Sequence, residues 1–177
     1  MDKGTTLKLF AFLMALAISL PALGSDTYYV YLVRHAEKDI SNPENKNPQL
    51  TACGVERAQR LGKILADVHL QAIYSSDYVR TRDTASPTAS ARDLPVQIYD
   101  PGHLDEVLQR LSTAKQNALV VGHSNTTSAL AGRLAGISLE NISEQEYDRL
   151  YQVVITDGHS TLQLLHQTFE CSRYQPS

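Results

Sequence analysis

The sequence predicts a three-layer α/β sandwich, with a largely parallel central sheet, helices on both faces and an edge hairpin. Apolar, strand-like runs alternate with segments of helical periodicity through most of the chain. Two of these runs end abruptly in polar pairs, Arg34-His35 and Gly122-His123. Ligands of open α/β sheets bind beyond the carboxyl ends of the strands, so we expect a functional site where these pairs meet.

The first half of the domain is predicted to hold two strands and two helices. Residues 28–33 form a β-branched and aromatic strand, and the polar loop Asp39–Gln49 follows it. Thr51 is the predicted N-cap of a helix. Its buried stripe is expected to comprise Val55, Ala58, Leu61, Leu65 and Val68. Residues 72–76 read as a strand, and residues 78–91 as a helix that Pro87 interrupts.

The second half continues the alternation. Residues 96–99 form a third strand, the turn 100–102 follows, and apolar residues at 104, 107, 108 and 111 mark a helix. Residues 118–121 are all apolar and predict a central strand. A helix over 126–134 is expected to end at Gly136, and the strands 153–156 and 161–165 to form a hairpin at the sheet edge.

Residues 1–24 are predicted to be a secretory signal peptide, which leaves residues 25–177 as the domain. Lys3 and Lys8 precede an apolar run over 9–20, and small residues lead to cleavage after Gly24. An uncleaved anchor is the alternative, although the run is short for a membrane span. We therefore expect export to a bacterial periplasm, with no stable membrane insertion after cleavage.

Charge and cysteine content narrow the possible partners. Without residues 1–24 the chain has 14 basic and 18 acidic residues, a net charge of −4. This balance argues against a nucleic-acid or anionic-membrane binder. Export permits a disulfide, so Cys53 and Cys171 either pair, tying the first helix to the C-terminal tail, or remain free thiols.

The polar strand ends suggest an anion-binding site. A cation beside an imidazole, as in Arg34-His35, suits a phosphorylated substrate, and a histidine can act as a nucleophile. Arg80 follows the second predicted strand, and His123 follows the fourth. Parallel strands would bring these four residues to one edge of the sheet.

Four motifs follow one another along the chain: Arg34-His35-Ala36-Glu37, Leu50-Thr51-x-x-Gly54-x-x-x-Ala58, Ser76-x-x-x-Arg80-x-x-x-Thr84-Ala85 and Gly122-His123. In type and order they resemble the motifs of the histidine phosphatase, or phosphoglycerate mutase-like, superfamily. The first departs from the family's Arg-His-Gly signature by having Ala for Gly. The compact length resembles the small single-domain phosphatases of the family rather than its larger sugar-phosphate mutases.

The resemblance implies a role for each residue of the site. His35 would be the nucleophile that forms a phosphohistidine, with its other ring nitrogen hydrogen-bonded to a backbone carbonyl. Arg34 and Arg80 would bind the phosphoryl oxygens, His123 would donate a further hydrogen bond as an imidazolium, and the backbone amide of Ser124 would add another. The resemblance implies a metal-independent phosphatase without a cofactor.

The general acid is the least defined residue of the site. One branch of the family places it directly after the second histidine, where this chain has Ser124-Asn125. The other branch uses a carboxylate after the third strand, where Asp100 fits best; the alternative for Asp100 is a turn-forming role. Asp105 and Glu106, on the polar face of the next helix, are expected to be solvated.

The expected function is that of an exported phosphatase acting on a phosphomonoester or a phosphohistidine, with a small phosphorylated substrate or a phosphoprotein as partner. A non-catalytic phospholigand-binding module and a phosphomutase are the alternatives. A zinc hydrolase using His35, Glu37 and His123 is a further one. Glu37 is otherwise expected to pair with a basic residue or to lie at the pocket rim.

Overall fold

The computed structural model describes residues 26–171, so the predicted signal peptide over residues 1–24 lies outside the described residues. Within them the elements are β1 (Thr27–Arg34), α1 (Ala52–Ile64), β2 (Ala72–Ser76), α2 (Val79–Ser90), β3 (Val96–Tyr99), α3 (Leu104–Ala114), β4 (Ala118–Gly122), α4 (Ser124–Ala135), β5 (Arg149–Thr156) and β6 (His159–His166). No helix of this part of the chain is long and apolar enough to cross a membrane.

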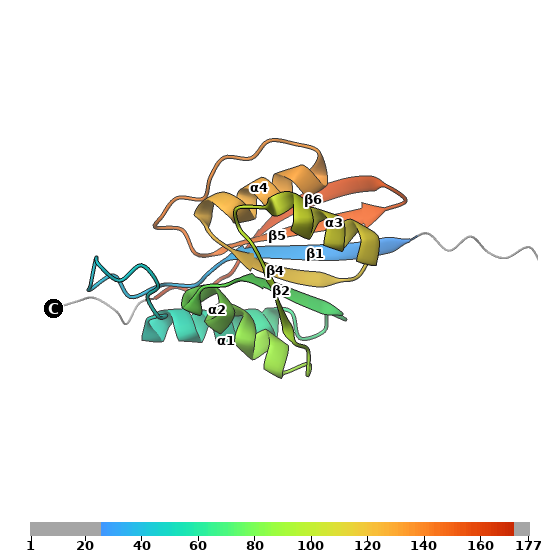
Figure 1. Ribbon diagram of the computed structural model, residues 1–177. Helices are drawn as coiled ribbons and strands as arrows, with labels where there is room; N and C mark the ends of the chain where they lie inside the picture. Colours follow the sequence, from blue (N-terminus) through green and yellow to red (C-terminus); the bar gives the residue numbers. More distant parts are fainter. Residues whose placement is uncertain (1–25, 172–177) are drawn as a thin grey trace, which may run out of the picture.

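The strands form one sheet in the order β3-β2-β4-β1-β5-β6. The first four of these pair in parallel, whereas β5 runs antiparallel to β1 and continues into β6 as a hairpin. Helices α1 and α2 cover one face of the sheet, and α3 and α4 cover the other (Figure 1). The predicted three-layer α/β fold with a largely parallel sheet and an edge hairpin is confirmed.

Side chains of β1 alternate between two hydrophobic cores. Val30 and Leu32 pack in the core that includes residues of α3 and α4, while Tyr31 and Val33 pack in the core that includes residues of α1 and α2. Successive strand residues point to opposite faces, so a strand covered on both sides must be apolar throughout. All five residues of β4 are buried, as expected for a central strand.

Helix α1 begins as predicted, and Ala58, Leu61 and Leu65 of the predicted stripe are buried. Thr51 is the N-cap, and its hydroxyl accepts a hydrogen bond from the Gly54 amide at 3.1 Å. The prediction that Val55 is buried is wrong, because its side chain is 45% exposed. Gly54 faces inward instead, where a Cβ atom would lie 2.3 Å from the Glu37 carbonyl oxygen. A close backbone contact therefore sets the rotation of the helix.

Helix α2 runs without interruption from Val79 to Ser90, so the predicted break at Pro87 is wrong. A proline inside a helix removes the hydrogen bond that its own nitrogen would donate, here to the carbonyl of Asp83, and its ring crowds that carbonyl. Asp83 is exposed, so water can satisfy that carbonyl. The last turn continues because the Ala91 amide still donates to the Pro87 carbonyl at 3.2 Å.

The remaining elements differ from prediction mainly at their ends. Helix α4 starts at Ser124, two residues earlier than predicted, and ends at Gly136, whose φ is 70°. The β5–β6 hairpin turns at Asp157 and Gly158, which have φ values of 50° and 82°. Two positive φ angles in a two-residue turn match the right-handed twist of the strands, and aspartate–glycine suits them.

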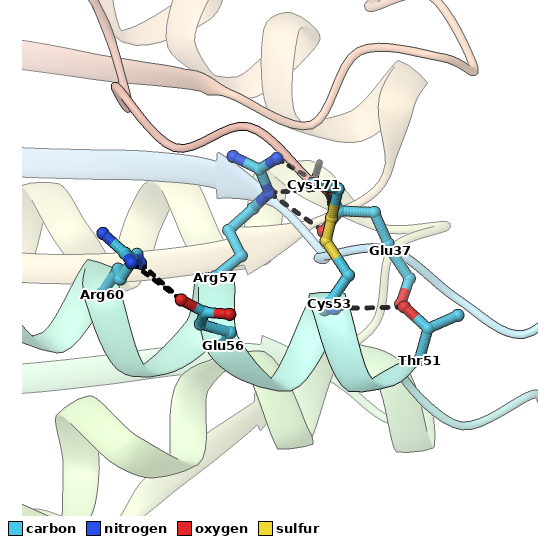
Figure 2. The surroundings of a disulfide bond; sticks show 8 residues. Glu37, Thr51, Cys53, Glu56, Arg57, Arg60 and Cys171 are labelled. Carbon is cyan, nitrogen blue, oxygen red and sulfur yellow. Dashed lines mark hydrogen bonds and ion pairs between the residues drawn. A yellow bond between two sulfur atoms is a disulfide. The ribbon is translucent and has the colours of Figure 1, made fainter. Parts of the chain in front are cut away.

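A disulfide between Cys53 and Cys171 joins the start of α1 to the chain that follows β6 (Figure 2). This decides between the two states predicted for the cysteines. Glu37 lies beside the disulfide and receives hydrogen bonds from Nε of Arg57 at 2.9 Å and from Nη2 at 2.6 Å. Its carboxylate therefore has the structural pairing that the sequence offered as one of two possibilities.

Candidate active site

The register of β1 and β4 places the two histidines side by side. Arg34 is opposite Gly122, and the amide of His35 donates to the Gly122 carbonyl oxygen at 2.9 Å. His35 directly follows β1 and His123 directly follows β4, and the centroids of the two imidazole rings lie 5.6 Å apart. The sheet thus brings the histidines together at the edge where the sequence predicts a site.

His35 is buried and held in one orientation. Its Nδ1 lies 2.8 Å from the Ala36 carbonyl oxygen, the hydrogen bond predicted for the ring nitrogen that does not react. The bond requires a proton on Nδ1, which leaves Nε2 with a free lone pair. Burial, together with the charges of Arg34 and Arg80, lowers the pKa of His35 to about 3, against the effect of the Ala36 bond. The ring is therefore neutral at pH 7.

His123 contacts a different set of side chains. Its Nε2 lies 2.8 Å from Oγ of Ser76, at the end of β2, and the Tyr78 ring packs edge-on against it with centroids 5.0 Å apart. Burial and the nearby Arg80 and Arg34 lower its pKa to about 4. The ring is therefore neutral at pH 7, whereas the sequence predicts an imidazolium. Two guanidinium groups close by make a third cation unfavourable.

Arg34 is buried, and the protein uses most of its donors. Nη1 donates to the carbonyl oxygens of Ser143 at 2.8 Å and Glu146 at 3.0 Å, and Nη2 donates to Glu144 at 2.7 Å. The guanidinium carbon lies 4.3 Å from the centroid of the Tyr147 ring. Arg34 thereby fastens the segment before β5 to the end of β1.

Arg80 keeps its donors free. It lies in the first turn of α2, and its guanidinium carbon is 4.5 Å from the centroid of the Tyr78 ring. Its Nε and Nη1 atoms are buried and have no hydrogen-bond partner among residues 26–171. Such donors are costly to leave unpaired, so they suit an anion that binds beside them.

The other two predicted residues have different surroundings. Ser124 opens α4, so its amide belongs to the first turn, where backbone donors lack helical partners. Asp100 follows β3 and is exposed; its oxygens accept from the Gly102 amide and from Nδ1 of His103, both at 2.8 Å. Asp100 thus makes the turn contacts that the sequence offers as its alternative role.

The zinc alternative needs Glu37 to converge with the histidines, and the structure places it elsewhere. Arg57 binds both of its oxygens. In the described part of the chain, the donors close enough for a shared metal ion are Glu37, Cys53 and Cys171, and the two sulfurs are joined in the disulfide. The arrangement around His35 instead combines imidazole and guanidinium groups, which suit a phosphoryl anion.

Sequence analysis gave no role to four side chains of the site: Ser76, which it named only within a motif, and Tyr78, Glu144 and Tyr147. The first two carry a local signal, since they end β2 and directly precede the helix of Arg80. The other two lie in the segment between α4 and β5, which has no regular apolar pattern and is about 110 residues from Arg34 along the chain. Only the fold brings this segment to the pocket.

The chain is similar to known histidine phosphatases in part of its sequence and in its fold. The family model described as histidine phosphatase superfamily (branch 1) matches residues 30–107, which include Arg34, His35 and Arg80. No curated protein matches the chain by sequence.

Solved structures share the fold at low identity. The alpha-ribazole phosphatase from Shigella flexneri has a TM-score of 0.65 and 22% identity, covering 78% of this chain and 96% of its own. The protein histidine phosphatase SixA in complex with tungstate has a TM-score of 0.64 and 18% identity, covering 78% of this chain and 96% of its own. A mycobacterial glucosyl-3-phosphoglycerate phosphatase has a TM-score of 0.65 and 13% identity, covering 80% of this chain and 100% of its own. The family match over residues 30–107 and the shared fold agree in showing that this chain is similar to members of the histidine phosphatase superfamily.

Proposed function

We propose that the chain is a phosphatase that hydrolyses a phosphomonoester or a phosphohistidine through a phosphohistidine intermediate on His35. The observation that carries this proposal is a neutral, oriented His35 beside two arginines and a second histidine. A lone pair on Nε2, in a cationic and partly dry pocket, is what nucleophilic attack on phosphorus requires.

The proposed reaction has two steps. Nε2 of His35 forms a bond to phosphorus while the bond to the leaving oxygen breaks and that oxygen takes the electron pair. Water then attacks phosphorus, the nitrogen–phosphorus bond breaks, and its pair returns to His35. Arg80 and Arg34 stabilise the charge on the phosphoryl oxygens, and His123 and the Ser124 amide donate to them. These cations do the work that a metal does in other phosphatases, so we propose no metal and no cofactor.

The solved structures that this chain resembles are named for different phosphorylated substrates. The names of the similar structures refer to an alpha-ribazole phosphate, a phosphohistidine protein and a glucosyl-3-phosphoglycerate, which share a phosphoryl group and little else. We therefore propose a small phosphorylated compound or a phosphoprotein as substrate. We also propose export to a bacterial periplasm, with residues 1–24 as a cleaved signal peptide.

The test is a phosphatase screen of the protein over many phosphorylated compounds, with His35→Ala alongside. We expect phosphate release from at least one compound and a loss of at least about 1000-fold in His35→Ala, because no other group replaces the nucleophile. His69→Ala is the matched control: it removes an exposed imidazole far from the pocket and should leave the rate unchanged. Wild-type turnover in His35→Ala would refute the assignment.

The same screen separates the alternatives. A phospholigand-binding module would retain phosphorylated compounds without releasing phosphate. A phosphomutase would pass the phosphoryl group to a sugar or glycerate acceptor, so product analysis with such acceptors would detect transfer in place of free phosphate.

A further inference from the structure

Glu144 places a carboxylate at the mouth of the pocket. Its Oε2 lies 2.7 Å from Nη2 of Arg34, and its Oε1 accepts from the Ser124 hydroxyl at 2.5 Å. Arg34 is the last residue of β1 and Ser124 is the first residue of α4, so each partner is adjacent in sequence to one of the two histidines. Its side chain is 61% exposed, so the carboxylate lies between the buried phosphoryl site and solvent.

Backbone hydrogen bonds hold the chain in place before and after Glu144. The Ile142 amide donates to the Ser124 carbonyl oxygen at 2.9 Å, which fixes the chain before it. On either side of Glu144, the carbonyl oxygens of Ser143 and Glu146 accept from the buried Nη1 of Arg34. The carboxylate is thus presented by an anchored segment.

The Glu144 carboxylate and the charged groups around it shift one another's pKa values. Ser124, Arg34 and Lys38 lower the pKa of Glu144, the Ser124 hydrogen bond most of all, so the group is ionised in the protein alone. Its charge in turn raises the pKa values of His123, Arg80 and Tyr147. The charged and titratable groups that face it are Arg34, Lys38, Arg80, His123 and Tyr147.

A bound phosphoryl group would reverse this environment. A phosphate dianion competes with Glu144 for Arg34, and it adds negative charge beside the carboxylate. Both effects disfavour the charged form of a carboxyl group, so the pKa of Glu144 would rise and the group would take a proton from solvent. Binding of substrate then supplies a protonated carboxyl group beside the arginine that binds the phosphoryl oxygens.

We propose that Glu144 is the general acid of the reaction; this inference rests on the proposed phosphatase function. As the bond from phosphorus to the leaving oxygen breaks, the carboxyl proton passes to that oxygen and the leaving group departs as an alcohol. In the second step the resulting carboxylate takes a proton from the attacking water, which restores the acid. Glu144 fills the role for which the sequence offers Asp100.

The experiment compares Glu144→Gln with wild type on two esters that differ in leaving group, phenyl phosphate and dinitrophenyl phosphate. Phenolate needs a proton to leave, whereas dinitrophenolate does not. We expect kcat/KM for phenyl phosphate to fall about 100-fold or more, and that for dinitrophenyl phosphate to change by less than about threefold. Glu140→Gln, the same change at an exposed position of the same segment, should leave both rates unaltered.

Other outcomes overturn the proposal. Equal losses on both esters would make Glu144 a structural or binding residue. Faster turnover of both, with stronger inhibition by inorganic phosphate, would make it an anion that competes with substrate. Failure of the proposed function is recognised separately, as the absence of a His35-dependent rate on either ester in the wild-type protein.

Discussion

At the scale of single residues, the two arginines of the pocket differ in how the protein uses their donors. Nη1 of Arg34 binds two backbone carbonyls and Nη2 binds Glu144. Arg80 keeps two buried donors unpaired, and its flat face rests on the Tyr78 ring. Arg34, whose buried Nε is also unpaired, therefore both positions the segment of Glu144 and keeps a donor for an anion, whereas Arg80 offers two such donors.

We predict that Arg80→Lys weakens inhibition by inorganic phosphate about 10- to 100-fold, the effect of losing one charge-assisted hydrogen bond of about 1.5–3 kcal/mol. A lysine keeps the charge but lacks the planar array of donors and the stacking surface. Arg82→Lys is the matched control, since Arg82 is exposed on the same helix and pairs with Asp77. The inhibition constants of both variants are measured against one substrate; equal shifts in the two would contradict the assignment to Arg80.

At the scale of elements, the start of α1 rests on the chain that leaves the active site. The Thr51 amide donates to the Glu37 carbonyl oxygen at 2.9 Å, and Gly54 approaches the same oxygen too closely to carry a side chain. The Thr51-x-x-Gly54 spacing thus has a physical basis. Thr51 caps α1, and Gly54 lets the helix pack closely against the Glu37 backbone.

Two glycine-to-alanine substitutions in α1 should have opposite effects. Gly54→Ala forces a methyl group against the Glu37 backbone and should lower the free energy of unfolding by about 1–3 kcal/mol. Gly62→Ala meets only ordinary contacts, the nearest being Oγ1 of Thr88 at 3.5 Å, and should raise it by about 0.5–1 kcal/mol. Urea unfolding of both variants checks the pair; stabilisation by Gly54→Ala would disprove the close contact.

At the scale of the whole molecule, the disulfide links the start of α1 to the chain that follows the last strand, β6. Cys53 and Cys171 are 118 residues apart in sequence, and their Cα atoms lie 5.9 Å apart. The chain before Cys171 also lies against α1, where the Phe169 ring faces the guanidinium groups of Arg57 and Arg60. Figure 2 shows the Glu37–Arg57 ion pair beside the disulfide.

We predict that the double variant Cys53→Ser, Cys171→Ser loses about 2–5 kcal/mol of unfolding free energy, because a long loop is no longer closed in the unfolded chain. Denaturant unfolding with and without dithiothreitol measures the effect. The reductant should bring the wild type to the stability of the variant and leave the variant unchanged. A wild type indifferent to reductant would show that the link contributes nothing.

Prediction from sequence succeeded where a local pattern determines the structure. Apolar runs at β1 and β4, alternating with helical segments, indicate buried parallel strands, and parallel strands bring their polar ends, Arg34-His35 and His123, to one edge. It failed where a neighbour far along the chain decides. Val55 fits the apolar period of α1, but the Glu37 backbone sets the rotation of that helix and buries Gly54.

The sequence by itself determined the α/β fold, the strands that end in the pocket, and the histidine and arginine side chains that meet there. Only the tertiary structure decided that the cysteines pair, that the Asp100 carboxylate binds the Gly102 amide, and that Glu144 lies against Arg34. The physical reason is range. Strand and helix periodicity depends on residues that are close in sequence, whereas the segment of Glu144 is positioned by hydrogen bonds to a buried arginine about 110 residues away.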